Sequence, residues 1–176
     1  MLKLIDADIK YLEQYREAYF ESLKQIQLGN IKNHDLMFLN PDEENVIQIF
    51  KDNRDVTKLP SYYVPSYDFF AVDEGKFIGI IRIRIKLTDS LMKYGGHIGY
   101  AVNPKYWNMG YGKEILRLGL TQYKHLIEED KILLTCDDDN IASYKIIEAN
   151  GGILENKIEN EVSGERFLTR RYWINK

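Results

Sequence analysis

The stretch from residue 97 to residue 120, HIGYAVNPKYWNMGYGKEILRLGL, constrains the fold more than any other part of the chain. An apolar strand ends at Val102, Pro104 prevents it from continuing, and Gly110 and Gly112 open an amphipathic helix. Glycines at a helix start let a phosphate approach the exposed N–H groups at the positive end of the helix dipole. The stretch therefore predicts a site for an anion, namely a pyrophosphate. The alternative is that the glycines only permit a tight helix–strand contact.

Helical periodicity is clear before this stretch. Apolar residues that include Ile9, Leu12 and Tyr19 predict an amphipathic helix over about residues 9 to 27, with Asp8 as its N-cap. The segment from about residue 31 to residue 66 is polar and irregular, with a short helix in ENVIQIFKD. Long connections in a compact domain are usually functional or mobile.

Strand patterns dominate the remainder. YDFFAV and FIGIIRIRIKL form a hairpin across DEGK, with isoleucines on the core face and basic residues facing water or a charged partner. GGHIGYAV and KILLTC are strands, a helix runs from Asn140 to the glycines at 151 and 152, and ILENKIEN pairs with RFLTRRYWI across VSG. This order predicts an α/β (α+β) fold with a mixed, mostly antiparallel central sheet of about six or seven strands, helices on both faces, and a single domain over residues 1–176.

Composition excludes several classes of function. The net charge of −3 gives no basic field for nucleic acid. No signal peptide is apparent, and no apolar run approaches the roughly 20 residues that cross a bilayer. Cys136 is the single cysteine, so an internal disulfide is impossible, which fits a reducing compartment. We expect a cytoplasmic monomer or homodimer that binds neither nucleic acid nor membrane.

Two motifs carry a family resemblance. Val102-Asn103-Pro104 followed by Trp107-Asn108-Met109-Gly110-Tyr111-Gly112 resembles the apolar–x–Pro step and the [RQ]-x-x-G-x-[GA] turn of the GNAT superfamily of acetyl-CoA-dependent N-acetyltransferases. LLTCDDDNIASYKIIEANGG resembles its second motif, with Asn140, Ser143 and Gly151 at matching positions. The runs GGHIGYAV, LLTCDDDNIAS and RRYWI are similar to a bacterial group known only as predicted acetyltransferases.

The resemblance implies how acetyl-CoA would bind as co-substrate. Backbone groups of Tyr100, Ala101 and Val102 would pair with the pantetheine arm, and the amides of Asn108, Met109, Gly110, Tyr111 and Gly112 would hold the pyrophosphate. Asn140 and Ser143 would contact the pantetheine or its thioester end, although Asn140 also suits a helix N-cap. Trp107 replaces the usual Arg or Gln, which predicts weaker binding; its indole would stack on the adenine or pack. No metal is implied.

The resemblance is less complete for proton transfer. The usual acid, a Tyr four residues after Ser143, is Ile147 here, so Tyr144, about 60° away around the helix, is the candidate acid or else a packing residue. His97 stands where many relatives have a Glu and would act as base, unless it only bonds to a neighbouring strand. His34 and His125 have no comparable context.

Other reactive residues receive minor roles. Cys136 follows an apolar strand and is expected to be a buried thiol rather than a nucleophile. The acidic run of residues 137–139 is expected to be a solvated loop that could attract a cationic amine, and Tyr62 and Tyr63 could contact the acceptor. The chain is therefore predicted to move acetyl from acetyl-CoA to a primary amine of a small-molecule or peptide acceptor, by direct attack in a ternary complex. The alternative is a non-catalytic CoA-binding sensor.

Overall fold

The computed structural model describes residues 1–43, 45–162 and 164–176. Within these ranges the chain forms seven β-strands: β1 (Lys3–Asp6), β2 (Ser66–Asp73), β3 (Lys76–Arg84), β4 (Ile98–Val102), β5 (Lys131–Asp137), β6 (Ile153–Val162) and β7 (Glu165–Asn175). The same ranges contain five α-helices: α1 (Leu12–Gln27), α2 (Val46–Asp52), α3 (Asp89–Lys93), α4 (Tyr111–Tyr123) and α5 (Ile141–Ala149).

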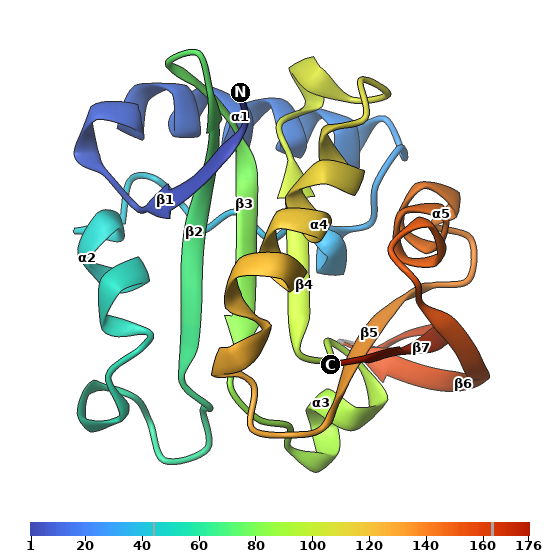
Figure 1. Ribbon diagram of the computed structural model, residues 1–176. Helices are drawn as coiled ribbons and strands as arrows, with labels where there is room; N and C mark the ends of the chain where they lie inside the picture. Colours follow the sequence, from blue (N-terminus) through green and yellow to red (C-terminus); the bar gives the residue numbers. More distant parts are fainter. Residues whose placement is uncertain (44, 163) are drawn as a thin grey trace.

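The strands form two sheets (Figure 1). The first has the order β1-β2-β3-β4 and the second the order β5-β7-β6, and every pair within them is antiparallel. The predicted α+β class is confirmed, with the strands divided between two sheets. β4 and β5 are outer strands of their own sheets, and this division shapes the candidate site.

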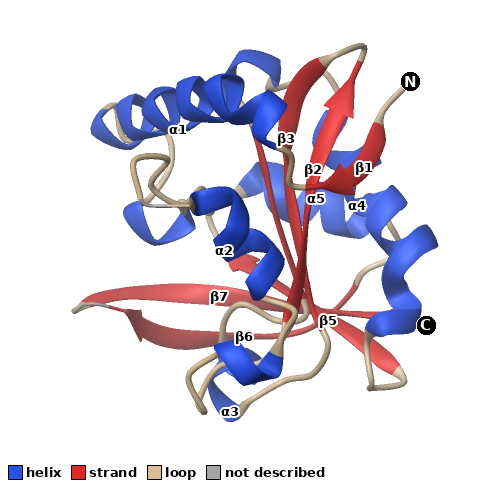
Figure 2. Cartoon of the chain, turned by 90° about the vertical axis from the view of Figure 1, so that its left-hand side faces the viewer, coloured by secondary structure: helices blue, strands red, loops and turns tan. Residues whose placement is uncertain are grey.

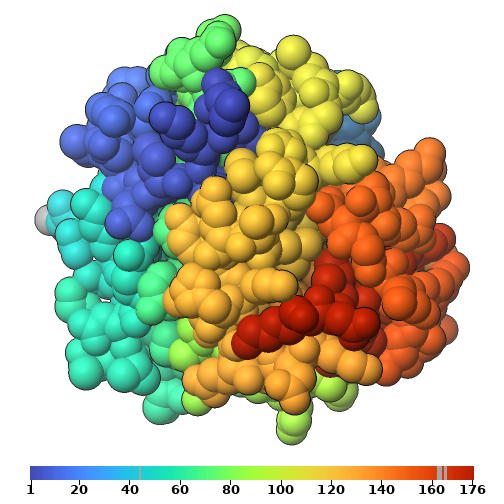
Figure 3. All heavy atoms as spheres, in the orientation of Figure 1, coloured from blue at the N-terminus to red at the C-terminus, as the bar shows by residue number. Residues whose placement is uncertain are grey.

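Helices cover both faces of the first sheet (Figure 2). On the α1 and α2 side the core is aromatic: Tyr15 is fully buried and stacks on Phe70 with ring centroids 5.5 Å apart. On the α4 side, Ile81 and Ile115 pack in one cluster with Tyr172 of the second sheet. Burying such a side chain contributes about 1.5–3 kcal/mol, so the two clusters hold the layers together. In the space-filling view (Figure 3) the C-terminal residues (red) lie against those of α4 (gold).

The first predicted helix is confirmed, and Leu12 and Tyr19 of its predicted apolar face pack against the aromatic core, whereas Ile9 does not. The helix starts with a 3₁₀ turn, Ile9–Tyr11, in which Asp8 accepts a hydrogen bond from the Lys10 N–H at 3.0 Å. Ile9 is 66% exposed, whereas Tyr15 is 0% exposed. Tyr15 can be buried because its hydroxyl donates to the Leu39 carbonyl at 2.8 Å.

The hydrophobic periodicity of the sequence did not predict two short elements, β1 and α3. β1 has four residues and is defined by its pairing with β2; α3 has five residues and is capped by Thr88. The C-terminal hairpin is confirmed as β6 and β7, although Ser163 of its predicted turn lies outside the described residues. Glu44 of the predicted ENVIQIFKD helix also lies outside them, and the described part of that helix is α2. In the described ranges, none of the helices has the length and apolar character that crossing a bilayer requires.

The basic face of β3 is satisfied by protein partners rather than by water. Arg82 Nε donates to Asp68 Oδ1 at 2.6 Å, and Asp68 is 2% exposed. Arg84 Nη1 donates to the carbonyls of Gly95 and Gly96 at 3.2 and 3.1 Å, and burial lowers the pKa of Arg84 to about 10. A charged partner is therefore found for Arg82, whereas Arg84 bonds to backbone carbonyls and Lys86, beyond the end of β3, is exposed.

Candidate active site

The two sheets meet at a seam formed by His97 and Leu133. The His97 N–H donates to the Leu133 carbonyl at 2.8 Å, and the Leu133 N–H donates to His97 Nδ1 at 2.8 Å. Beyond this seam β4 pairs with β3, and β5 pairs with β7. The two outer strands therefore diverge from the seam.

This divergence leaves backbone groups of β4 unpaired with a strand. His97 C=O and Asn103 N–H both bond to the β3 side of the ladder. Because alternate residues of an antiparallel strand bond to the same neighbour, Tyr100 and Val102 direct their backbone groups to the opposite edge. Trp107 Nε1 donates to the Val102 carbonyl at 2.9 Å. The backbone N–H and C=O of Tyr100 are thus available to a ligand at this edge, whereas the Val102 carbonyl already accepts a hydrogen bond from the Trp107 indole.

The turn after β4 depends on capping and on left-handed backbone. The Asn103 side chain accepts the Lys105 N–H at 3.1 Å, and Asn108 has a φ of 61°. Gly110, with a φ of 83°, is the N-cap of α4. A left-handed N-cap favours glycine, and the first N–H groups of a helix have no intrahelical acceptor. The turn therefore presents amides that suit a phosphate.

The two motif glycines have different roles. A side chain at Gly110 would enter open space, whereas a Cβ at Gly112 would lie 2.7 Å from Ile146 Cδ1 and 3.6 Å from Val102 Cγ2. The tight-contact interpretation therefore holds for Gly112, which lets α4 approach α5 and β4 closely. Lys113 follows in the first turn of α4 and lines the same space as Gly110, where its ammonium suits a phosphate.

The start of α5 lies across the gap from β4. Asn140 Oδ1 accepts the Ser143 N–H at 3.1 Å, so Asn140 is the N-cap of α5, as its alternative interpretation predicted. The Tyr100 hydroxyl donates to the Ser143 carbonyl at 3.3 Å, and burial raises the pKa of Tyr100. This bond ties β4 to α5.

These elements form one wall of a cavity of about 620 Å³. All but one of the residues predicted to bind the cofactor line it: Tyr100, Ala101, Val102, Trp107, Asn108, Gly110, Tyr111, Gly112, Asn140 and Ser143. The exception is Met109, which is 63% exposed and does not line the cavity. We call this side, the lining residues within 100–113 and 140–146, the motif wall.

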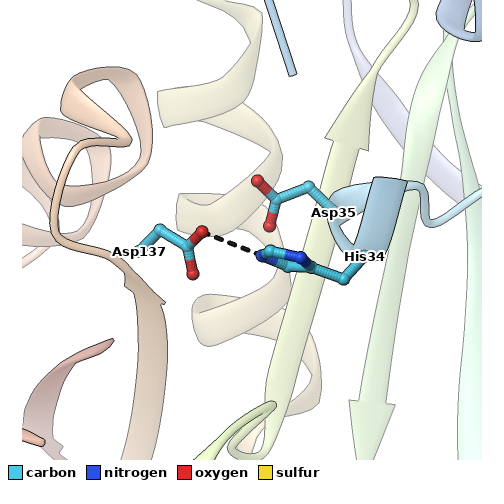
Figure 4. A group of neighbouring side chains, drawn as sticks. All are labelled: His34, Asp35 and Asp137. Atoms are coloured by element: carbon cyan, nitrogen blue, oxygen red, sulfur yellow. Dashed lines mark hydrogen bonds and ion pairs between the residues drawn. The ribbon is translucent and has the colours of Figure 1, made fainter. Parts of the chain in front are cut away.

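The opposite side of the cavity comes from the segment after α1, residues 29–38, which we call the loop wall. Its 3₁₀ helix, Asn33–Asp35, brings His34 and Asp35 to the end of β5, where they face Asp137 (Figure 4). His34 Nε2 lies 2.9 Å from Asp137 Oδ2. Lys32 Nζ donates to Asp137 Oδ2 and Asp139 Oδ1, at 2.9 Å each.

Sequence reasoning missed this cluster. It treated Asp137 as part of a solvated loop, which was wrong: the residue ends β5 and is 1% exposed. His34 had no apparent context, yet its ring stacks on Phe167 with centroids 4.4 Å apart. Two partners of His34, Asp137 and Phe167, are more than a hundred positions away in the chain, and no local pattern predicts such contacts.

One carboxylate of this cluster, that of Asp137, is balanced by a neighbouring ammonium. His34, Asp35 and Asp137 offer atoms that lie within 4.8 Å of one another and could ligate a metal ion. The ammonium of Lys32 already neutralises Asp137, so the group needs no metal to balance that carboxylate. Burial lowers the pKa of Lys32, but its bonds to Asp139 and Asp137 prevail and raise the pKa to about 12. Burial, and then the charge of Asp137, raise the pKa of the half-buried Asp35 to about 6.

The geometry argues against the base role predicted for His97. The residue is 0% exposed and does not line the cavity. Since Nδ1 accepts the Leu133 N–H, Nε2 carries the proton and donates to Glu129 Oε2 at 3.0 Å. Burial lowers the pKa of His97. With both nitrogens engaged, the ring bonds to a neighbouring strand, which was its alternative interpretation.

Tyr144, the predicted acid, also lies outside the cavity lining. The Arg170 guanidinium carbon lies 4.1 Å from the centre of its ring, which fits the packing role. Cys136 is buried, and burial raises the pKa of its thiol to about 12, as expected of an inert thiol. Tyr62 and Tyr63 are exposed and do not line the cavity.

The chain belongs to the acetyltransferase (GNAT) domain family, whose sequence profile matches residues 13–153. No curated protein matches the sequence at a significant level.

Solved structures share the fold over nearly the whole chain. The microcin C7 self-immunity acetyltransferase MccE, in complex with acetyl-CoA and AMP, is 18% identical with a TM-score of 0.72, covering 99% of this chain and 92% of its own. RimL, a ribosomal L7/L12 alpha-N-protein acetyltransferase in complex with coenzyme A, is 15% identical with a TM-score of 0.71, covering 99% and 93%. A chimera of the Vibrio cholerae spermidine N-acetyltransferase SpeG and hSSAT is 16% identical with a TM-score of 0.63, covering 99% and 94%. At these identities the matches establish the fold.

Proposed function

We propose that the chain transfers an acetyl group from acetyl-CoA to a primary amine by direct attack in a ternary complex. The observation that carries this proposal is the motif wall, where an open strand edge, a turn rich in amides and a capped helix line one cavity. A ligand with an extended arm and a phosphate end would be complementary to these features, because the arm can pair with the strand edge and the phosphate can bind the turn amides.

Each part of the motif wall has a distinct task in this proposal. The backbone of Tyr100 pairs with the pantetheine arm, and the amides from Asn108 to Gly112, with Lys113, hold the pyrophosphate. Ser143 lies near the thioester end. The Trp107 indole keeps the Val102 carbonyl occupied, so it shapes the edge rather than stacking on adenine. RimL and SpeG are named as acetyltransferases of a protein and of spermidine, which supports an amine as the acceptor.

Calorimetric titration with acetyl-CoA and with desulfo-CoA tests the cofactor assignment. Gly110→Val should weaken binding at least tenfold, because a β-branched residue disfavours the left-handed backbone that aims the turn amides. Gly151→Val is the matched control: Gly151 also has a left-handed φ, of 87°, with nothing within 4 Å of an added Cβ, and it does not line the cavity. The absence of binding to either ligand would refute the proposal.

A specific observation also favours the CoA-binding sensor. Both residues predicted to move protons, His97 and Tyr144, lie outside the cavity lining. A sensor would bind acetyl-CoA but release no thiol with any primary amine in a broad panel, whereas a transferase would release thiol and form the acetylated amine in equal amounts.

A further inference from the structure

We propose that Asp35 is the base that takes the proton from the acceptor ammonium, and that Asp35, with Asp137 and His34 beside it, forms the site for a cationic amine. Of these three residues, Asp35 is the one that lines the cavity. This inference rests on the proposed function, because it concerns the acceptor side of the same cavity. It assigns to the loop wall a task that neither sequence motif describes.

The position of Asp35 is the first argument. Asp35 lines the same cavity as the motif wall but comes from the separate segment after α1. Figure 4 shows its carboxylate beside the bond that joins the His34 ring to Asp137 at the end of β5. An amine that enters between the two walls therefore meets Asp35 from one side and the predicted thioester position, near Ser143, from the other.

An unsatisfied buried acceptor is the second argument. Asp137 Oδ2 receives Lys32 and His34, whereas Asp137 Oδ1 is buried and has no hydrogen-bond partner among the described residues. A buried polar atom without a partner costs about 1–3 kcal/mol. An ammonium has three N–H donors, so one bound at Asp35 can also donate to the neighbouring Asp137 carboxylate.

The charges around Asp35 select the kind of acceptor. Three carboxylates, those of Asp35, Asp137 and Asp139, surround one ammonium, that of Lys32. The excess negative charge attracts a cation and repels a carboxylate placed beside the reacting amine. The preferred acceptor is thus a polyamine-like cation and not a free amino acid.

The proton balance is simple. The acceptor ammonium gives one proton to an Asp35 carboxylate oxygen, and the amine lone pair then attacks the thioester carbonyl carbon. The carbon–sulfur bond breaks, and the second amine proton reaches the thiolate directly or through water. Asp35 returns its proton to solvent, so the products are the amide, the thiol and one proton.

A base must be ionised at the working pH and able to hold a proton. The pKa of Asp35, raised to about 6, meets both conditions at neutral pH. The titratable and charged groups that face Asp35 from its own segment, from β5 and the residues after it, and from the turn before β4 are Lys32, His34, Cys136, Asp137, Asp139 and Tyr94.

The test compares Asp35→Asn with Asp130→Asn, using spermidine and glycine as acceptors. Asp130 is exposed and does not line the cavity, so its variant controls for the lost charge. Asp35→Asn should lower kcat with spermidine by roughly 100-fold or more, while acetyl-CoA affinity changes less than twofold. The wild-type rate should fall as the pH drops through about 6, and this acid limb should disappear in Asp35→Asn. Asp35→Glu should restore part of the rate and the limb.

The outcomes separate the two proposals. If acetyl-CoA fails to bind, the proposed function is wrong and the base assignment falls with it. If acetyl-CoA binds and Asp35→Asn works as fast as Asp130→Asn with the acid limb intact, Asp35 is not the base and the transferase proposal stands. If glycine is acetylated as readily as spermidine, or spermidine is not acetylated at all, the cationic-acceptor assignment is overturned.

Discussion

The two walls of the cavity are built in contrasting ways. The motif wall consists of a strand, a turn and helix ends, and it offers mainly backbone amides and carbonyls. The loop wall is a connecting segment with a single 3₁₀ turn, and it offers charged side chains. A regular scaffold suits a ligand that is the same for a whole family, whereas an irregular segment can change its side chains without disturbing a sheet. Under the proposed function, the cofactor and the acceptor are therefore recognised by separate walls.

The largest expected effect comes from removing the buried carboxylate of β5 to which the loop wall is bonded. Asp137→Ala should lower the free energy of unfolding by roughly 3 kcal/mol, because Lys32 and His34 lose a buried charged partner. Asp139→Ala removes a bond to the same lysine, but Asp139 is 70% exposed, so its cost should be less than about 1 kcal/mol. Urea denaturation of both variants measures the difference, and equal losses would contradict the buried role of Asp137.

A second test concerns the seam between His97 and Leu133, from which β4 and β5 diverge. His97→Phe should destabilise the fold by about 2 kcal/mol, because the buried Leu133 N–H loses its acceptor. His97→Asn keeps an acceptor atom near the position of Nδ1 and should recover most of that loss. It should also keep acetyl transfer within a few-fold of wild type. A large loss of kcat in a stable His97→Asn variant would instead restore the base role of this residue.

The loop wall should also show a conflict between stability and function. The pKa of folded Asp35, about 6, lies above its usual value of 3.8. The contribution of protonated Asp35 to the free energy of unfolding is fully present below the pKa of this residue in the unfolded chain, and it is lost as the pH rises through its pKa in the folded protein. Asp35→Asn should therefore raise the free energy of unfolding at pH 8 by about 1–2 kcal/mol, with a gain that shrinks as the pH is lowered. Destabilisation at pH 8 would show that the ionised carboxylate has a partner that stabilises it.

The smallest expected effect is the acid sensitivity of the seam. The pKa of folded His97 is lowered from 6.5 by burial. Below pH 6.5 the unfolded chain binds a proton that the folded protein does not, so the free energy of unfolding should fall as the pH drops. Asp35, whose pKa is raised in the folded protein, instead increases the free energy of unfolding as the pH drops over the same range. Chemical denaturation of the wild type and of His97→Asn across this pH range isolates the contribution of His97. The free energy of unfolding should fall less with decreasing pH in His97→Asn than in the wild type.

Sequence reasoning could predict the motif wall because its determinants are local. The Gly110 N-cap, the Gly112 contact and the Asn140 cap each depend on residues within a short stretch or on neighbouring elements. It could not predict the loop wall, because His34 and Asp137 are 103 positions apart. His97 shows a third case. Its position was identified, but its role depends on Glu129 and Leu133, and contacts with these residues cannot be seen in a strand pattern.

The strand order of the second sheet has a consequence for the synthesis of the protein. β7 lies between β5 and β6 and is the last of the described strands along the chain. During translation neither β5 nor β6 has a strand to pair with until β7 leaves the ribosome, whereas the first sheet has its final strand once residue 102 has emerged. A single domain generally folds as a unit. The end of β5, and with it Asp137, therefore cannot reach its final pairing before β7 has emerged, whereas all strands of the first sheet are available earlier.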